Sequence, residues 1–182
     1  MEIAVLDWIQ SIRTPIGDMI VPLITRLGDA GKVWILMSVI FLLHPKSRRN
    51  GVILAVALCV DLVLCEGILK NVFERTRPFY VNTSVQLLIP RPGGYSFPSG
   101  HTAASFTAVA ALYFAGERKR LWSVLVLALL IAFTRLYLYV HYPTDIVGGV
   151  IAGIAAGYIG NRLVSRFWRR KGRIEKRIEE DT

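Results

Sequence analysis

Three short polar clusters interrupt an otherwise apolar chain of 182 residues, and they hold the side chains that could do chemistry. The clusters are residues 70–78, 98–101 and 135–145. Among their side chains, three permanent cations, two imidazoles and one carboxylate are the candidates for chemistry: Lys70, Arg77, Arg135, His101, His141 and Asp145. Arginine binds phosphate oxygens through a bidentate fork, and lysine adds a point charge. If the clusters meet, they therefore predict a site that stabilises a phosphoryl group during transfer.

The two histidines of these clusters are suited to different roles. His141 and Asp145 are four residues apart, which on a helix places them on one face within hydrogen-bond reach. A carboxylate that holds one ring nitrogen leaves the other nitrogen free to attack phosphorus. His101 has no neighbouring carboxylate in the sequence, so we expect it to protonate the leaving oxygen, as an imidazole can near neutral pH.

Two helix N-termini are predicted beside these side chains. Ser99 and Gly100 precede one apolar segment, and Pro143 suits the first turn of another. The free backbone N–H groups and the positive end of the dipole at each helix start favour an anion. The polar group that meets His101 at the edge of an apolar segment is then a phosphate ester.

The elements that must position these residues are apolar. The chain is 53% hydrophobic with a mean hydropathy of +0.46, which indicates a membrane protein. Five segments have about the length needed to cross a hydrocarbon core, and they should be helices because lipid offers the backbone no hydrogen-bond partner. They are residues 29–44, 50–69, 100–115, 121–140 and 144–166.

The first 27 residues carry several charges and are interrupted at Thr14-Pro15. We interpret them as an interfacial helix followed by a short or partial sixth span. The predicted fold is therefore all-α: one domain over residues 1–182, forming a polytopic membrane bundle of five to six transmembrane helices with an N-terminal amphipathic helix.

Charge placement predicts the orientation in the cell membrane. The basic connections 44–50 and 116–120 and the basic stretch 166–173 belong in the cytoplasm by the positive-inside rule, as does the charged tail 167–182. The three polar clusters then lie at the extracytoplasmic face of a multi-pass protein. The net charge of +9 is divided among short clusters rather than spread along one face, so nucleic acid is not an expected partner.

Simpler interpretations exist for each feature alone. A lone Pro-Ser-Gly-His is more often a capping turn, and the charges around Lys70 could snorkel toward lipid phosphates. A metal site is not predicted, since His44 is expected at the opposite face and no cysteine pair is near. For Asp61 and Glu66, a structural salt bridge and a functional role are equally compatible with the sequence. Glu66 lies one turn before Lys70 on the same expected helix and could hold its ammonium.

From Lys70 to Asp145 the three clusters resemble the membrane-bound type 2 phosphatidic-acid phosphatases. That family's pattern is Lys-x6-Arg-Pro, then Pro-Ser-Gly-His, then Ser-Arg-x5-His-x3-Asp, with Thr134 standing here for the serine. The resemblance implies a helical bundle that works without metal or other cofactor. Its implied phosphate ligands are Lys70, Arg77, Arg135, Ser99 and Gly100. It makes His101 the general acid, His141 the nucleophile that forms a phosphohistidine, and Asp145 the partner of His141.

The loop LLIPRPGGYSFPSGHT looks like that of bacterial undecaprenyl-diphosphate phosphatases. The implied substrate is a polyprenyl diphosphate, namely undecaprenyl diphosphate, cleaved to the monophosphate during carrier-lipid recycling for cell-wall synthesis. Phosphatidylglycerophosphate or phosphatidate would fit the same chemistry. A lipid phosphotransferase, a phospholipid-binding or transport protein and, more remotely, a vanadate-dependent peroxidase are the alternatives. The sequence leaves the oligomeric state open.

Overall fold

The chain is described by a computed structural model that covers the backbone of residues 1–180 and the side chains of residues 1–170. Within those limits every regular element is helical. The elements are α1 (Glu2–Ser11), α2 (Pro15–Leu27), η1 (Asp29–Gly31), α3 (Lys32–Leu43), η2 (Pro45–Ser47), α4 (Arg48–Asp61), the π-helix η3 (Leu62–Leu69), α5 (Lys70–Phe73), α6 (Pro78–Val81), α7 (Gly100–Ala115), α8 (Leu121–Tyr137) and α9 (Pro143–Glu180).

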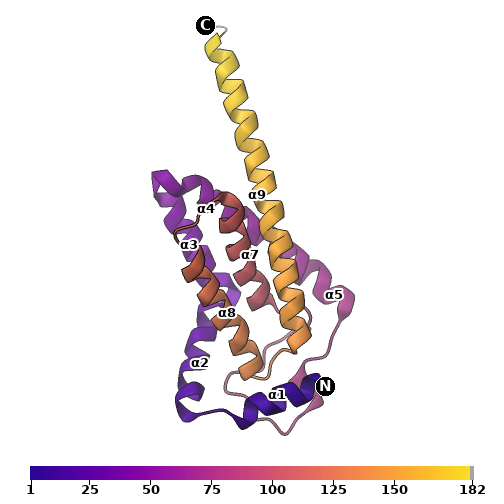
Figure 1. Cartoon of the computed structure of the whole chain (residues 1–182). Coiled ribbons are helices and arrows are strands. Elements are labelled where there is room, and N and C mark those ends of the chain that lie inside the picture. The colour runs from indigo at the N-terminus through magenta and orange to yellow at the C-terminus, as the bar shows by residue number, and fades with distance from the viewer. Residues whose placement is uncertain (181–182) are drawn as a thin grey trace.

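Each of the five apolar segments expected to be helical is helical over most of its length, but two helices are shorter than expected. α3 covers Lys32–Leu43 of the expected 29–44, and α8 covers Leu121–Tyr137 of the expected 121–140. The second expected segment is one unbroken helical stretch made of α4, η3 and α5. Two stretches are long and apolar enough to cross a membrane, Pro45–Val81 and Pro143–Arg170, and α8 is a shorter apolar helix. α9 continues well past the other helices in Figure 1, so the described part of the expected tail 167–182 is helical. Residues 181–182 of that tail lie outside the described residues.

α7 and α9 lie side by side along the centre of the bundle (Figure 1) because glycines allow a close approach. A Cβ atom added at Gly149 would lie 2.9 Å from Cβ of Thr102, and one added at Gly157 would lie 2.6 Å from Cβ of Ala110. These glycines of α9 therefore serve helix packing. The close crossing also joins the starts of the two helices, where the N–H of Ser99 donates to the Asp145 carbonyl over 3.1 Å.

The N-terminal segment divides at the expected place. Thr14 is the N-cap of α2, and its hydroxyl accepts the N–H of Gly17 over 3.1 Å. α1 lies across one end of the bundle in Figure 1, with Leu6 and Ile9 buried there. The Tyr139 hydroxyl, from the turn after α8, donates to Asp7 over 2.6 Å. α1 is thus fixed to the end of the bundle where the polar clusters lie.

Candidate active site

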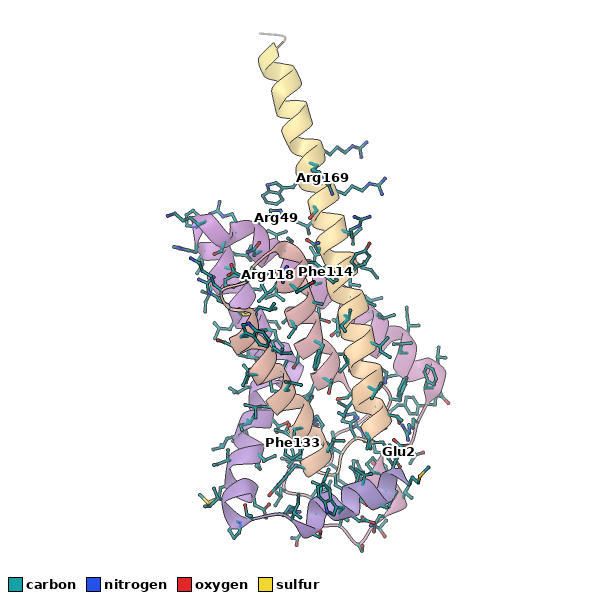
Figure 2. The ribbon with its side chains drawn as sticks, in the orientation of Figure 1. Glu2, Arg49, Phe114, Arg118, Phe133 and Arg169 are labelled. Atoms are coloured by element: carbon teal, nitrogen blue, oxygen red, sulfur yellow. The ribbon has the colours of Figure 1, made fainter. Side chains whose placement is uncertain are left out.

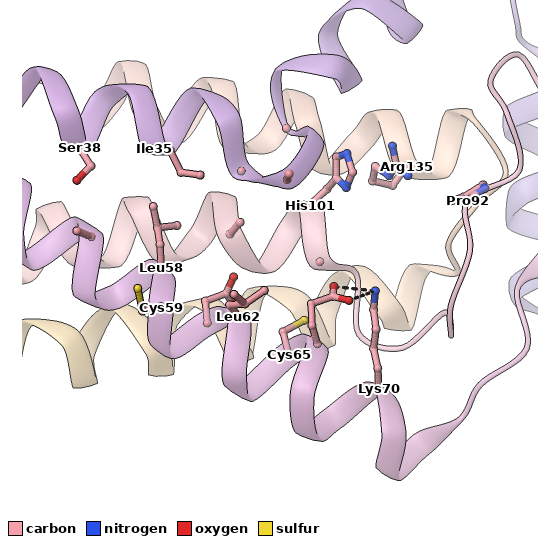
Figure 3. Close-up of a pocket in the computed structure, with 18 of the residues that line it drawn as sticks. Ile35, Ser38, Leu58, Cys59, Leu62, Cys65, Lys70, Pro92, His101 and Arg135 are labelled. Atoms are coloured by element: carbon pink, nitrogen blue, oxygen red, sulfur yellow. Dashed lines mark hydrogen bonds and ion pairs between the residues drawn. The ribbon is translucent and has the colours of Figure 1, made fainter.

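The three polar clusters meet at one end of a cavity of about 790 Å³ that opens between α3, α4, η3 and α7. Six of the eight residues expected in the site line this cavity: Lys70, Arg77, Gly100, His101, Arg135 and His141. The rest of the wall is mainly apolar. In Figure 3, Ile35, Leu58 and Leu62 lie along one part of the cavity, and Lys70, His101 and Arg135 lie at the other end. The cavity thus joins a cationic end to an apolar one.

Lys70 is held by Glu66, as the one-turn spacing suggested. The ammonium lies 2.7 Å from the Glu66 carboxylate, a pair drawn in Figure 3. A Cβ atom added at Gly100 would lie 2.6 Å from Oε1 of Glu66, so this carboxylate sits against the start of α7. Asp61 is buried in the cavity wall, and its Oδ1 has no hydrogen-bond partner in the described part of the chain.

Arg77 is buried, and it uses its N–H groups on protein acceptors. Nε donates to the Gly94 carbonyl over 3.0 Å, and Nη2 donates to the Gly93 carbonyl over 2.9 Å. Nη1 donates to the Val140 carbonyl over 3.0 Å and lies 3.2 Å from Nε2 of His141. Arg77 therefore ties the loop before α7 to the turn that carries His141, while its charge stays at the cavity.

One N–H donor of the Arg135 guanidinium, Nε, is unpaired in the described part of the chain. The Arg135 side chain is buried, and Nη1 donates to the hydroxyl of Thr25. A buried donor without an acceptor is costly, and a bound anion would remove that cost. Because Arg135 lines the cavity beside His101 (Figure 3), its guanidinium is well placed to receive a phosphate oxygen.

His141 and Asp145 lie close together, with Nδ1 3.4 Å from Oδ2 of Asp145. That distance is too long for a strong hydrogen bond, and Nδ1 is unpaired among the described residues. The Asp145 carboxylate is fixed by other donors, since Oδ2 accepts the Ser96 hydroxyl over 2.5 Å and the Tyr142 N–H over 2.8 Å. Asp145 is therefore firmly fixed by Ser96 and Tyr142, whereas its own contact with His141 is weak.

Burial lowers the pKa of His141, in the turn between α8 and α9, to about 3. The Asp145 carboxylate opposes this shift, whereas the charges of Arg135 and Arg77 act in the same direction as burial. The ring is therefore neutral at physiological pH. A neutral imidazole keeps the lone pair that a nucleophile needs.

Arg75 is a residue of the site that the sequence pattern did not single out. Its Nη1 donates to Oδ1 of Asp145 over 2.7 Å, and its Nη2 donates to Glu2 over 2.5 Å. The guanidinium also lies over the Tyr142 ring, 3.9 Å from its centroid. Arg75 therefore connects α1 to the carboxylate beside His141. Only its charge within the first cluster hinted at a role, and Ser96 and Glu2 gave no signal.

The contacts of Glu2 predict a pH dependence of stability. Burial opposes the shift, but hydrogen bonds from Thr144 and Arg75 lower the pKa of Glu2 below its ordinary value of 4.5. Glu2 then stabilises the fold at pH values above about 4.5, and this contribution is lost as the pH falls through its lowered pKa. We expect Glu2→Gln to lower the melting temperature at pH 7, with a difference from wild type that shrinks as the pH falls through the lowered pKa of Glu2. A constant difference at all pH values would contradict this account.

Ser99 and Thr134 are not among the residues that line the cavity. The Ser99 hydroxyl is the N-cap of α7, accepting the N–H of Thr102 over 3.4 Å. The Thr134 hydroxyl donates to the Ile131 carbonyl within α8 over 2.6 Å. In this structure both hydroxyls serve their helices, and a direct contact between Ser99 and phosphate stays a prediction.

His101 has a carboxylate partner that its sequence neighbours did not reveal. Its Nε2 lies 3.0 Å from Oδ1 of Asp29 in η1. The two residues are 72 positions apart in the chain, so no local pattern could have paired them. The site therefore contains two histidines, and each lies beside an aspartate.

The protein is thus a helical bundle whose apolar cavity ends in cationic side chains and histidines. Such a cavity suits an amphipathic anion. Residues 50–169 match the PAP2 superfamily, and the chain belongs to this superfamily.

Relatives and a solved structure support this assignment. The undecaprenyl-diphosphatase of Sulfolobus acidocaldarius is 30% identical over 73% of this chain, and the match spans 64% of that relative's length, just under two thirds. The lipid A 4'-phosphatase of Bacteroides thetaiotaomicron is 30% identical over 92% of this chain and 80% of its own. The crystal structure of Aquifex aeolicus LpxE superposes with a TM-score of 0.76 at 30% identity, covering 88% of this chain and 94% of that one. These named relatives include phosphatases of membrane lipids.

Proposed function

We propose that the protein is a lipid phosphatase that passes the phosphoryl group of its substrate to His141 and then to water, with no metal or other cofactor. One observation carries the proposal: the basic side chains and both histidines lie at one end of an apolar cavity. A phosphate fits the cationic end, and the hydrocarbon of the same lipid fits the apolar wall.

In the first step, Nε2 of His141 attacks phosphorus. This nitrogen faces Arg77, whereas Nδ1 faces Asp145. An N–P bond forms, the bond from phosphorus to the leaving oxygen breaks, and that oxygen takes a proton from His101. In the second step, water attacks phosphorus and gives a proton back to His101, and the N–P bond breaks to release phosphate. Lys70, Arg77 and Arg135 stabilise the charge on the phosphoryl oxygens throughout.

The distribution of charge supports a particular orientation in the membrane. Figure 2 shows Arg49, Arg118 and Arg169 at the end of the bundle opposite Glu2. If the five apolar helical segments cross the bilayer, the positive-inside rule places this arginine-bearing end in the cytoplasm. We therefore place the catalytic end at the extracytoplasmic face of the cell membrane, with α1 lying along the interface there.

The favoured substrate is undecaprenyl diphosphate, converted to the monophosphate in the recycling of the cell-wall carrier lipid. The similarity of the loop before His101 to those of undecaprenyl-diphosphate phosphatases supports this choice. The Sulfolobus acidocaldarius relative is also named for this activity.

A second candidate substrate is a glycolipid phosphate of the lipid A type. The relative named as a lipid A 4'-phosphatase aligns with 92% of this chain, a larger share than the diphosphatase relative covers. Phosphatidylglycerophosphate and phosphatidate stay in the comparison because the same two steps would hydrolyse them. A lipid phosphotransferase would share the first step and differ only in the acceptor.

The experiment that tests the proposal is phosphate release by detergent-purified protein in excess EDTA. Undecaprenyl diphosphate, lipid A, phosphatidylglycerophosphate and phosphatidate are compared, with His141→Ala as the inactive control. Fastest release from the diphosphate, lost in the variant, is the expected result. Faster release from another lipid would keep the mechanism and overturn the favoured substrate. No release from any of them would overturn the hydrolase in favour of a transferase or a binding protein.

A further inference from the structure

We propose that Asp29 is a positioning residue for His101: its carboxylate fixes the ring and stabilises the imidazolium form that donates the proton. This inference rests on the proposed function, because it concerns the proton that His101 delivers to the leaving oxygen. It adds a second His–Asp pair to the site, built from a turn that lies outside the three motif clusters.

The contact itself decides which ring nitrogen is free. Nε2 of His101 lies 3.0 Å from Oδ1 of Asp29, within the range of an N–H···O hydrogen bond. Nδ1 is then the nitrogen left to serve the substrate. With Nε2–H directed at a carboxylate, a second proton on Nδ1 makes the imidazolium, and this is the proton that can be transferred.

The turn between α2 and α3 is shaped to fit the ring. A Cβ atom added at Gly28 would lie 2.8 Å from Cδ2 of His101, so only glycine leaves room for the imidazole here. Directly after Asp29, Ala30 has a φ of 50° and Gly31 a φ of 67°. Both angles lie in the left-handed region, which a residue such as alanine rarely adopts. The helical path from α2 to α3 is therefore kinked just after Asp29, close to the His101 ring.

The backbone of His101 is fixed to α3 by separate hydrogen bonds. The indole N–H of Trp34 in α3 donates to the Ser105 hydroxyl over 3.1 Å, and that hydroxyl donates to the His101 carbonyl over 2.7 Å. α3 is thereby joined to the first turns of α7. Because Asp29 lies just before α3, its carboxylate and the His101 ring belong to one joint between the two helices.

The charges around the ring explain why a carboxylate is useful. Arg135 from α8 and Lys70 from α5 line the same end of the cavity as His101, and both disfavour a further positive charge. Among the residues with described side chains, Asp29 supplies the carboxylate that contacts the ring, and it opposes part of the effect of these cations. Proton transfer then leaves a neutral ring that keeps Nε2–H on Asp29, and the water of the second step returns the proton to Nδ1.

The test is the dependence of rate on the leaving group. Phenyl phosphate releases a phenol with a pKa of about 10, like that of tyrosine, and needs a proton, whereas para-nitrophenyl phosphate releases a far weaker base. We expect Asp29→Asn to lower kcat/KM for phenyl phosphate about tenfold and for para-nitrophenyl phosphate less than about twofold. Asp18→Asn, which removes a carboxylate paired with Arg13 elsewhere in the bundle, should change both rates equally or not at all.

Equal losses for both esters in Asp29→Asn, with an active wild type, would overturn the role of Asp29 alone. A wild type that releases phosphate from neither ester nor any lipid would overturn the proposed function.

A measurement without turnover separates these cases further. In ¹⁵N NMR of protein carrying His44→Gln and His141→Gln, the neutral His101 ring should bear its proton on Nε2, and Asp29→Ala should mix the tautomers. A proton on Nδ1, or no change in Asp29→Ala, would overturn the inference.

Discussion

Replacing His141 with alanine should abolish lipid phosphatase activity, lowering kcat on the order of 10⁴-fold or more. The ring is the proposed nucleophile, so without it the two-step route has no first step. The cationic side chains of the phosphate site remain in this variant, because the contacts of Lys70 and Arg135 do not involve the His141 imidazole. We therefore expect binding of a non-hydrolysed lipid phosphate to change less than about tenfold. The measurements are phosphate release and a direct binding assay on the same detergent preparation.

The matched control for this variant is His44→Ala. His44 is exposed at the C-cap of α3, near the opposite end of the bundle, and should leave turnover unchanged. Because His141 is buried, His141→Asn is included to limit the cavity that the alanine creates. Activity retained by either His141 variant with a normal melting temperature would show that another group attacks phosphorus.

Replacing Arg135 with alanine should lower kcat/KM for the lipid substrate by about 10²–10³-fold, with a weaker phosphate affinity as part of the loss. The reason is that Nε of this buried side chain has no partner among the described side chains and is a donor for a phosphoryl oxygen. Arg135→Lys should restore little, because an ammonium cannot reproduce the planar fork or keep the bond to Thr25 at the same time. The measurement is a set of full rate curves for both variants.

Arg120→Ala is the control for Arg135. Arg120 is the N-cap of α8 and half exposed, at the other end of the helix that carries Arg135, so its loss should not alter kcat/KM. A normal kcat/KM in Arg135→Ala would remove this side chain from the phosphate site. Equal losses in Arg120→Ala and Arg135→Ala would point to a change in folding rather than in phosphate binding.

The sequence by itself determined the helices and the residues of the three clusters. Apolar runs of membrane length must be helical, because the backbone hydrogen bonds have to close within each segment, and this is a local requirement. Lys70, His101 and His141 lie near the ends of apolar segments, and this too can be read from the sequence. Together with the expected alternation of the helices, it was sufficient to predict that these residues meet in one cavity.

The sequence also indicated a contact within a single helix. Glu66 and Lys70 pair across one turn. Such a contact follows from helical periodicity alone. The pair of His141 and Asp145 shows the limit of this reasoning, because the distance is 3.4 Å and other residues hold the carboxylate more firmly.

Only the tertiary structure decided which donors and acceptors are already occupied. The sequence does not distinguish Arg77 from Arg135. Arg77 donates to backbone carbonyls of the loop before α7, whereas Nε of Arg135 is unpaired within the described part of the chain. Asp29 meets His101 across 72 residues, and Arg75 joins Glu2 to Asp145. Each of these contacts depends on how separate helices cross. The physical reason is that a side chain's partners are set by packing between distant segments, which spacing along the chain does not contain.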